Sequence, residues 1–237
     1  CVLPRASVGK ILKKLFTLEK PKFIADILKK LFVWFYKIDL NEAEYSLDYY
    51  KSTQALFCRR LKKNQRTTAD NALIAAPVDG LISECGRINN NTLIQAKGID
   101  YTLDDLLLPK MSSKFVDGWF CTIYLAPYNY HRIHSPITAE IIANHYQPGD
   151  FWPVNNITVP RIKNLFAINE RITTFFEDNK NNFSAALVKV AALGVGNISV
   201  FYNDNYKFSN IKLRELQKQN FQDNQSQLFY FEPRIKI

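Results

Sequence analysis

The spacing of apolar residues changes near residue 70, and this change constrains the fold more than any other feature of the chain. Before it, apolar side chains recur at the three- and four-residue steps of one helix face, at Ile24, Ile27, Leu28, Leu31, Phe32 and Phe35. The lysines of this stretch lie mostly off that stripe, at Lys22, Lys29, Lys30 and Lys37. A shorter stripe from Val8 to Phe16 has the same pattern, and a third helix is expected from Ser52 to Lys63. The chain therefore begins with basic amphipathic helices.

Short strand-like runs follow residue 70, with turn residues between most of them. They are Leu81–Cys85, Thr92–Gln95, Phe120–Leu125, Ile137–Ala143, Ile172–Phe176, Ala185–Ala191 and Ile198–Tyr202. Only Leu103–Leu108 interrupts them with a brief helical signal. The sequence predicts an α+β fold, in which N-terminal amphipathic helices precede a mostly antiparallel β body. We expect a helical segment over 1–70, the β body over 71–202 and a divergent tail over 203–237.

Most of the formal net charge of +9 lies in the helical segment. Residues 1–70 contain 15 Lys and Arg against 7 Asp and Glu, which leaves +8. This asymmetry indicates a polyanionic partner, either an anionic phospholipid membrane surface or nucleic acid. Because the lysines alternate with an apolar stripe, and no base-reading module is recognisable, we expect membrane association and no nucleic-acid partner. The alternative is that both stripes pack against protein, since amphipathicity does not distinguish the two surfaces.

No apolar run in the helical segment is long enough to cross a bilayer. Its longest uninterrupted apolar run is Leu31–Tyr36, whereas a membrane-spanning helix needs roughly 20 apolar residues. We therefore expect peripheral binding on a membrane surface.

The cysteines show no Cys-x-x-Cys spacing and are too few for a disulfide scaffold; they are Cys1, Cys58, Cys85 and Cys121. They are expected to be unpaired, small, buried side chains. A reducing cytoplasm is the simplest setting for them.

Two histidines three residues apart are the first candidates for chemistry. His131 and His134 follow the turn-like stretch Ala126–Asn129 at the end of a predicted strand. An imidazole can take up and return a proton near physiological pH, so a close pair suits acid–base catalysis. Alone, the pair is equally consistent with ordinary solvent-facing side chains. No Glu-x-x-His context or cysteine cluster completes a metal site, so no metal is expected.

Asp79 is the candidate orienting acid. It lies between Pro77-Val78 and Gly80, where the backbone is expected to turn sharply. An Asp-Gly pair most often marks only a hairpin turn. In the functional interpretation, the carboxylate bonds one imidazole nitrogen and stabilises the imidazolium while the other nitrogen activates a hydroxyl.

Five successive segments resemble the bacterial phosphatidylserine decarboxylase family, in that family's order. They are Ala76–Ser83, Ile94–Gly98 with Tyr101–Leu103, Tyr124–Pro136, Pro148–Asp150 and Asn164–Arg171. The resemblance covers roughly residues 20 to 200. It implies a self-processing proenzyme that cuts its chain at a Gly-Ser bond and leaves a pyruvoyl group as its cofactor.

The resemblance also implies roles for the three candidate residues. Asp79 would be the orienting acid and His134 the base in the cleavage. His131 would act later, beside the amine of phosphatidylserine, when carbon dioxide is lost. The product would be phosphatidylethanolamine, made by a homodimer on the cytoplasmic face of the bacterial cytoplasmic membrane.

The chain departs from the family pattern after its last predicted strands. It contains no Gly-Ser dipeptide. The two serines nearest the expected cleavage site do not follow glycine, since Ser199 follows Ile198 and Ser209 follows Phe208. We therefore expect this chain alone to be inactive and unable to form the pyruvoyl group. Three explanations stay open: a truncated or frameshifted copy, a separately encoded α chain, or a non-catalytic homologue that binds lipid at the membrane.

Overall fold

A computed structural model describes residues 5–67, 72–95, 99–107, 109–155, 157–195, 198 and 200. Its contacts divide the chain into two compact units. Of the described residues, the helical unit contains those up to Ile82 together with Ile123–Thr138, and the sheet unit contains those in Ser83–Thr122 together with those from Ala139 onward. All three candidate residues lie in the helical unit.

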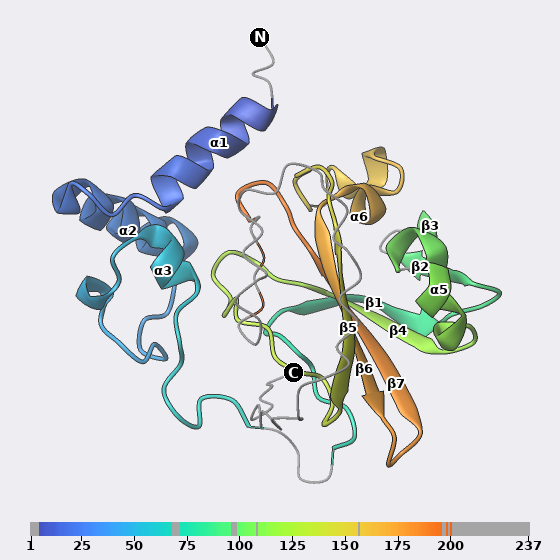
Figure 1. Ribbon diagram of the computed structural model, residues 1–237. Helices are drawn as coiled ribbons and strands as arrows, with labels where there is room; N and C mark the ends of the chain where they lie inside the picture. Colours follow the sequence, from blue (N-terminus) through green and yellow to red (C-terminus); the bar gives the residue numbers. More distant parts are fainter. Residues whose placement is uncertain are drawn as a thin grey trace. The chain divides into compact units, whose positions relative to one another are not determined.

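The helical unit begins with α1 (Arg5–Phe16) and α2 (Lys22–Tyr36), followed by the 3-10 turn η1 (Leu47–Tyr49) and the short α3 (Thr53–Phe57) (Figure 1). Their shared core consists of Phe32, Ile38, Tyr50 and Leu56. The ring of Phe16 from α1 meets that of Phe32 edge to face, with centroids 5.3 Å apart. This aromatic packing anchors α1 to α2.

Helix α2 has two apolar faces where the sequence indicated one. Ala25, Lys29 and Phe32 are buried, whereas a second face leaves Trp34 75% exposed; the other large exposed side chains of α2 are Phe23, Ile27, Leu31 and Phe35. The expectation that Lys29 lies off the buried face is wrong. Lys29 is 1% exposed, and its Nζ donates to Tyr50 O at 2.5 Å and pairs with Asp26 at 2.9 Å. Its charge is buried because these oxygens solvate it.

Helix α3 is much shorter than the predicted Ser52–Lys63. Ser52 caps it by accepting a hydrogen bond from Ala55 N at 3.2 Å, and the helix ends at Phe57. Beyond it, Glu44 N donates to Arg60 O and Lys62 N donates to Glu42 O, both at 2.9 Å. The backbone thus pairs with an earlier segment instead of continuing the helix, while the side chains of Arg60, Lys62 and Lys63 stay exposed.

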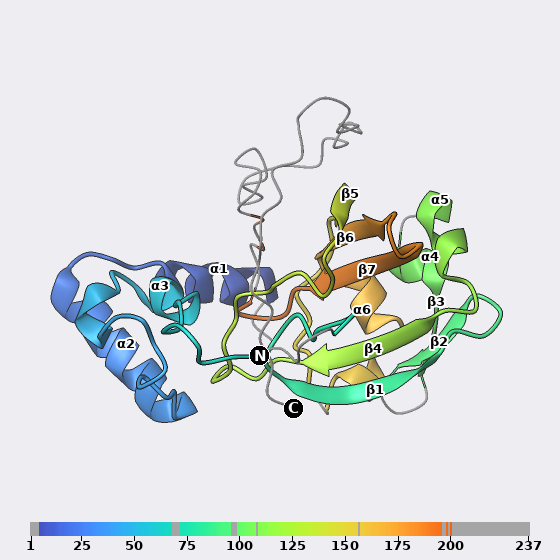
Figure 2. The same cartoon turned by 90° about the horizontal axis from the view of Figure 1, so that it is seen from below.

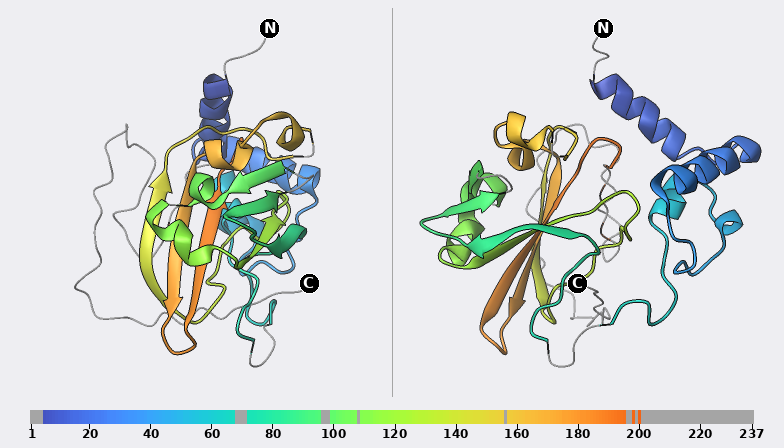
Figure 3. Two further views of the ribbon diagram at one scale, coloured as in Figure 1. Left: turned by 90° about the vertical axis from the view of Figure 1, so that its right-hand side faces the viewer. Right: turned by 180° about the vertical axis from the view of Figure 1, so that it is seen from behind.

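Within the described residues, the strands form three sheets. Strands β1 (Leu81–Arg87) and β4 (Trp119–Tyr124) lie side by side (Figure 2). Strands β2 (Thr92–Gln95) and β3 (Ile99–Thr102) form an antiparallel pair. The largest sheet is antiparallel in the order β5-β6-β7, with bounds Glu140–Gln147, Arg171–Asp178 and Phe183–Val190 (Figure 3).

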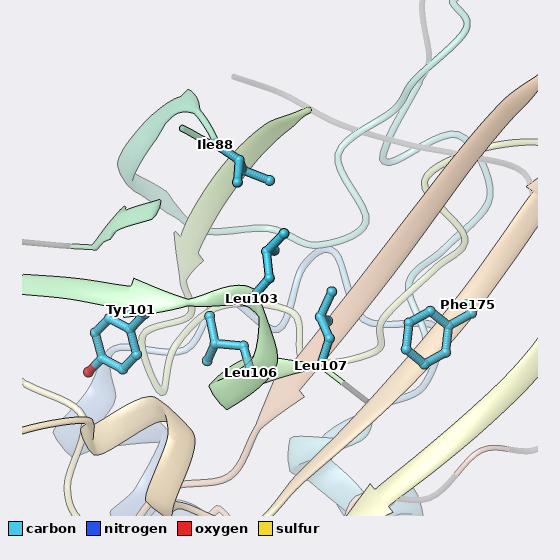
Figure 4. Close-up of a cluster of buried hydrophobic side chains, with 6 residues drawn as sticks. All are labelled: Ile88, Tyr101, Leu103, Leu106, Leu107 and Phe175. Atoms are coloured by element: carbon cyan, nitrogen blue, oxygen red, sulfur yellow. The ribbon is translucent and has the colours of Figure 1, made fainter. Parts of the chain in front are cut away.

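Short helices connect these strands. They are α4 (Leu103–Leu106), α5 (Pro109–Ser112), η3 (Ser113–Phe115), η4 (Val159–Arg161) and α6 (Leu165–Ile168). A core of Ile88, Tyr101, Leu103, Leu106, Leu107 and Phe175 joins α4 and β3 to the middle strand β6 (Figure 4). The buried Arg171 adds polar ties, since its guanidinium donates to Leu106 O at 3.1 Å, to Asp105 O at 2.6 Å and to Ala167 O.

The α+β prediction is confirmed, with local differences. Strand β5 starts at Glu140, three residues later than expected, because Ser135 Oγ donates to Ile137 O and holds a turn there. The expected strand Ile198–Tyr202 lies outside the described residues except for Ile198 and Val200. The tail 203–237, including Ser209, also lies outside them.

The cysteine prediction is wrong at three positions. Cys85 on β1 and Cys121 on β4 form a disulfide across the two strands, and Cys58 is exposed. Sequence spacing missed the pair because neighbouring strands bring together residues 36 positions apart. Cys1 lies outside the described residues.

Lys189 is a buried cation of the β5-β6-β7 sheet. Its Nζ donates to Thr174 Oγ1, which in turn donates to Asn144 Oδ1 at 2.7 Å. Desolvation lowers the pKa of Lys189 to about 7. The folded state therefore disfavours the ammonium form, whereas the unfolded chain keeps it up to the ordinary pKa of 10.5.

We predict that Lys189→Met stabilises the protein, by about 2 kcal/mol at pH 6. The unfolded state binds more protons than the folded state between pH 7 and 10.5, so wild-type stability rises with pH across that window. The advantage of the variant should therefore shrink towards pH 10. Urea denaturation of both proteins at pH 6 and pH 10 measures this, and an equal gain at both pH values would contradict it.

Candidate active site

Two segments of the helical unit lie side by side and assemble the candidate site. His134 N donates to Pro77 O at 2.8 Å, and Ala75 N donates to Pro136 O at 2.7 Å. A glycine is required at position 80, next to these two segments, because a Cβ there would lie 2.6 Å from Tyr124 O. The backbone of the Asp79 turn is thereby fixed next to the loop that carries both histidines.

The carboxylate of Asp79 is held by Arg66. Arg66 Nε donates to Asp79 Oδ1 at 2.9 Å and Nη2 donates to Oδ2 at 2.6 Å. The same guanidinium binds Glu42 through Nη1 at 2.9 Å and Nη2 at 2.7 Å. These charge-assisted bonds, first those to Asp79, raise the pKa of Arg66 above its ordinary value. Arg66 thus joins two carboxylates into one half-buried cluster.

His134 faces a tyrosine. Its Nε2 lies 3.1 Å from Tyr130 Oη, and the two rings are stacked with centroids 5.6 Å apart. Tyr130 is buried, so this hydrogen bond is shielded from water. The phenol can therefore pass a proton to or from the His134 imidazole.

His131 lies in a drier environment than its position in a loop suggests. Its Nδ1 is 2.9 Å from Asn129 O, and Phe57 packs on its ring with centroids 3.7 Å apart. Desolvation lowers the pKa of His131 to about 4. The imidazole is therefore neutral at physiological pH, and the carbonyl acceptor requires the proton on Nδ1, which leaves the lone pair on Nε2.

Three consecutive residues at the end of α3 contact the loop that carries His131 and His134. Phe57 stacks on His131, Cys58 O accepts a hydrogen bond from Arg132 Nε at 2.8 Å, and Arg59 Nη2 donates to Tyr128 O at 3.1 Å. These contacts join segments about 70 positions apart. Segment 57–59 therefore positions the loop that carries the candidate bases.

The structure brings the three predicted residues into one unit but does not join Asp79 to His134 by a hydrogen bond. Within the described chain, the Asp79 carboxylate is bound by Arg66. Sequence reasoning missed Arg59, Arg66 and Glu42, because the charge count assigned that segment to a membrane surface. The sequence did indicate another role for Arg59 and Arg66. Both lie outside the two apolar stripes on which the membrane interpretation depends.

The described residues contain no group of three or more His, Cys, Asp and Glu side chains arranged to hold a metal ion. The chemistry that the site offers is proton transfer. It combines a neutral imidazole, a phenol–imidazole pair and a carboxylate held by a guanidinium, which are the groups general acid–base catalysis uses.

Comparison with known proteins supports one family. The phosphatidylserine decarboxylase family model matches residues 53–220. The chain is 36% identical over 205 residues to the phosphatidylserine decarboxylase proenzyme of Myxococcus xanthus, which covers 86% of this chain and 72% of that protein. It is 38% identical over 228 residues to the proenzyme of Coxiella burnetii (strain Dugway 5J108-111), with 90% and 80% covered.

We predict that Arg66→Gln destabilises the protein by about 3 kcal/mol, because it leaves the carboxylates of Glu42 and Asp79 facing each other without a cation. Arg66→Lys should recover only part of the loss, since a lysine cannot bind both carboxylates through paired donors. Urea denaturation at pH 7 measures both variants. The matched control is Arg60→Gln, which removes the same charge from an exposed neighbour and should change little; an equal loss in that control would contradict the prediction.

Proposed function

The chain belongs to the phosphatidylserine decarboxylase family, and on that premise we propose that Asp79, His134 and His131 form its reactive site. The family is pyruvoyl-dependent and its substrate is phosphatidylserine. In our proposal, Asp79 is the orienting acid and His134 the base of self-cleavage. His131 serves the later decarboxylation, which yields phosphatidylethanolamine and carbon dioxide.

The observation that carries this proposal is the pairing of two motif segments that are distant in the sequence. His134 N bonds Pro77 O, so both predicted cleavage residues lie within one fixed piece of backbone. Arg66 holds the Asp79 carboxylate in place through an ion pair of 2.6 Å. Tyr130 gives His134 a partner for proton transfer. A random pair of loops would not place these groups together.

The two histidines suit different steps. His134 contacts a phenol that can exchange protons with it, which fits the activation of a hydroxyl. His131 is neutral with its lone pair on Nε2, which fits accepting a hydrogen bond from the substrate ammonium. We therefore assign the first to chain cleavage and the second to the substrate.

A pyruvoyl group supplies a carbonyl that withdraws electrons from the substrate as carbon dioxide leaves. The groups around Asp79, His131 and His134 fit such a cofactor, because they can hold the substrate amine and move protons beside it. The serine that would become the group is not present as part of a Gly-Ser dipeptide in these 237 residues. We propose that the 237-residue chain alone is not cleaved and forms no pyruvoyl group.

We also propose peripheral attachment to the cytoplasmic face of the bacterial cytoplasmic membrane. None of the described helices is long and apolar enough to cross a bilayer. The exposed face of α2 supports surface binding, because Trp34 and Phe35 can enter the interfacial region while Lys30 and Lys37 meet anionic headgroups. A homodimer and a separately encoded α chain are further proposals that come from the family alone.

A chimera can test the residue roles. Residues 1–195 are joined to the carboxy-terminal part of the Coxiella burnetii proenzyme, which by the family pattern contains the Leu-Gly-Ser segment. We expect the chimera to split into two chains and to convert phosphatidylserine to phosphatidylethanolamine. Asp79→Asn and His134→Gln should prevent the split, whereas His131→Gln should split normally and lose at least about 100-fold in decarboxylation rate.

The matched control is His145→Gln, which changes the remaining histidine, in the sheet unit, and should leave both steps intact. Intact-mass measurement follows the split, and lipid analysis follows the product. Normal splitting of the His134 variant would refute its role as base. The parent 237-residue chain is assayed in parallel, and phosphatidylethanolamine from it would refute the proposed inactivity.

The alternative function is a non-catalytic lipid-binding homologue, favoured by the apolar face that α2 leaves exposed. Trp34→Ser should weaken binding to vesicles containing phosphatidylserine by about 10-fold, because it removes apolar area that the bilayer would bury. Flotation measures binding, and Trp119→Ser is the control, since Trp119 is 74% exposed in the sheet unit. Equal binding of wild type and the Trp34 variant would contradict the attachment through α2. An inactive, uncleaved chimera that binds vesicles would favour the non-catalytic alternative, and an active chimera would show that residues 1–195 keep the groups needed for catalysis.

A further inference from the structure

Arg59 is a buried cation that the roles above do not use. It is 4% exposed, and its Nη2 donates to Tyr128 O at 3.1 Å and to Asn129 O at 3.5 Å. Its Nε and Nη1 are buried, and within the described chain they have no hydrogen-bond partner. Arg66 differs, because two carboxylates neutralise it. A guanidinium buried with only carbonyl partners keeps its full positive charge in a dry environment.

The charge of Arg59 lies next to His131. The carbonyl oxygen of Asn129 is shared, since it accepts from Arg59 Nη2 and lies 2.9 Å from His131 Nδ1. Phe57, two residues before Arg59, covers one face of the same imidazole. One short segment therefore shields the ring from water, fixes the carbonyl that its Nδ1 bonds, and places a positive charge beside it.

We propose that Arg59 is a positioning residue that holds the loop before His131 and keeps this imidazole neutral as the Nδ1–H tautomer. The inference deepens the proposed function, and it rests on the assignment of His131 to the substrate step. Its consequence is that the lone pair stays on Nε2, so the imidazole can accept a hydrogen bond from an ammonium group. An imidazolium would instead repel that group.

The other charges near His131 do not replace Arg59 in this role. Desolvation is the largest cause that lowers the pKa of His131, and the charge of Arg59 acts in the same direction. The charge of Asp79 acts the opposite way, but its carboxylate is bound by Arg66, which also holds Glu42. Arg132 adjoins His131 in the chain but donates to Cys58 O. The hydrogen bond to Asn129 O also favours the charged form, so the burial and the nearby guanidinium must outweigh it.

The test is an NMR titration of the full 237-residue chain labelled with 15N in histidine. The chain has three histidines, and His131→Gln assigns the signal. In the wild type, we expect the Nδ1–H tautomer at neutral pH and protonation only as the pH falls to about 4. Arg59→Gln should raise the proton affinity of His131 by about 10-fold, because the repelling charge is gone. Arg59→Lys keeps the positive charge and should raise the proton affinity of His131 less.

Arg60→Gln is the matched control, because it removes an exposed charge from the adjacent position and should leave the titration of His131 unchanged. A wild-type His131 that titrates near 6.5, or that carries its proton on Nε2, overturns the inference without any variant. Equal shifts in the Arg59→Gln and Arg59→Lys proteins also overturn it, since the charge would then not be the cause. No substrate or cleavage is involved, so failure here is distinct from failure of the chimera experiment.

Discussion

The double ion pair of Arg66 with Glu42 and Asp79 is the interaction on which the candidate site depends. It joins three segments of the helical unit through one guanidinium. Because Arg66 binds both carboxylates through paired donors, the Asp79 carboxylate is held where the Pro77 and Gly80 turn places it. The roles that we propose for His131 and His134 depend on the Asp79 carboxylate being held in place.

Two other buried cations donate to backbone carbonyls, and Lys29 pairs with Asp26 as well. Lys29 donates to carbonyls of Leu47 and Tyr50, and Arg171 donates to carbonyls at the ends of α4 and α6. The last carbonyls of a helix carry partial negative charge, which makes them suitable acceptors. Part of the positive charge in this protein is thus structural. By contrast, Lys13 and Lys14 on α1 and Lys30 on α2 have exposed side chains.

His131 and His134 are three residues apart but lie in different environments. Burial favours the neutral form of His131, on whose ring Phe57 packs, and Asn129 O fixes its tautomer, whereas Tyr130 provides His134 with a hydroxyl. Two identical side chains therefore have different neighbours. This difference fits the two successive proton-transfer tasks that we propose for them.

The sequence alone determined the α+β class, α1 and α2, and most strand positions, because apolar periodicity records which face of each element is buried. It also indicated Asp79, His131 and His134 as candidate site residues, which stay predictions, and the family, which the comparisons confirm. Only the tertiary structure decided that Lys29 is buried, that α3 stops at Phe57, that Arg59 bonds the loop carrying the histidines and that Arg66 binds the Asp79 carboxylate. These features depend on contacts between segments distant in the chain, and local periodicity contains no information about which distant oxygen will solvate a buried charge.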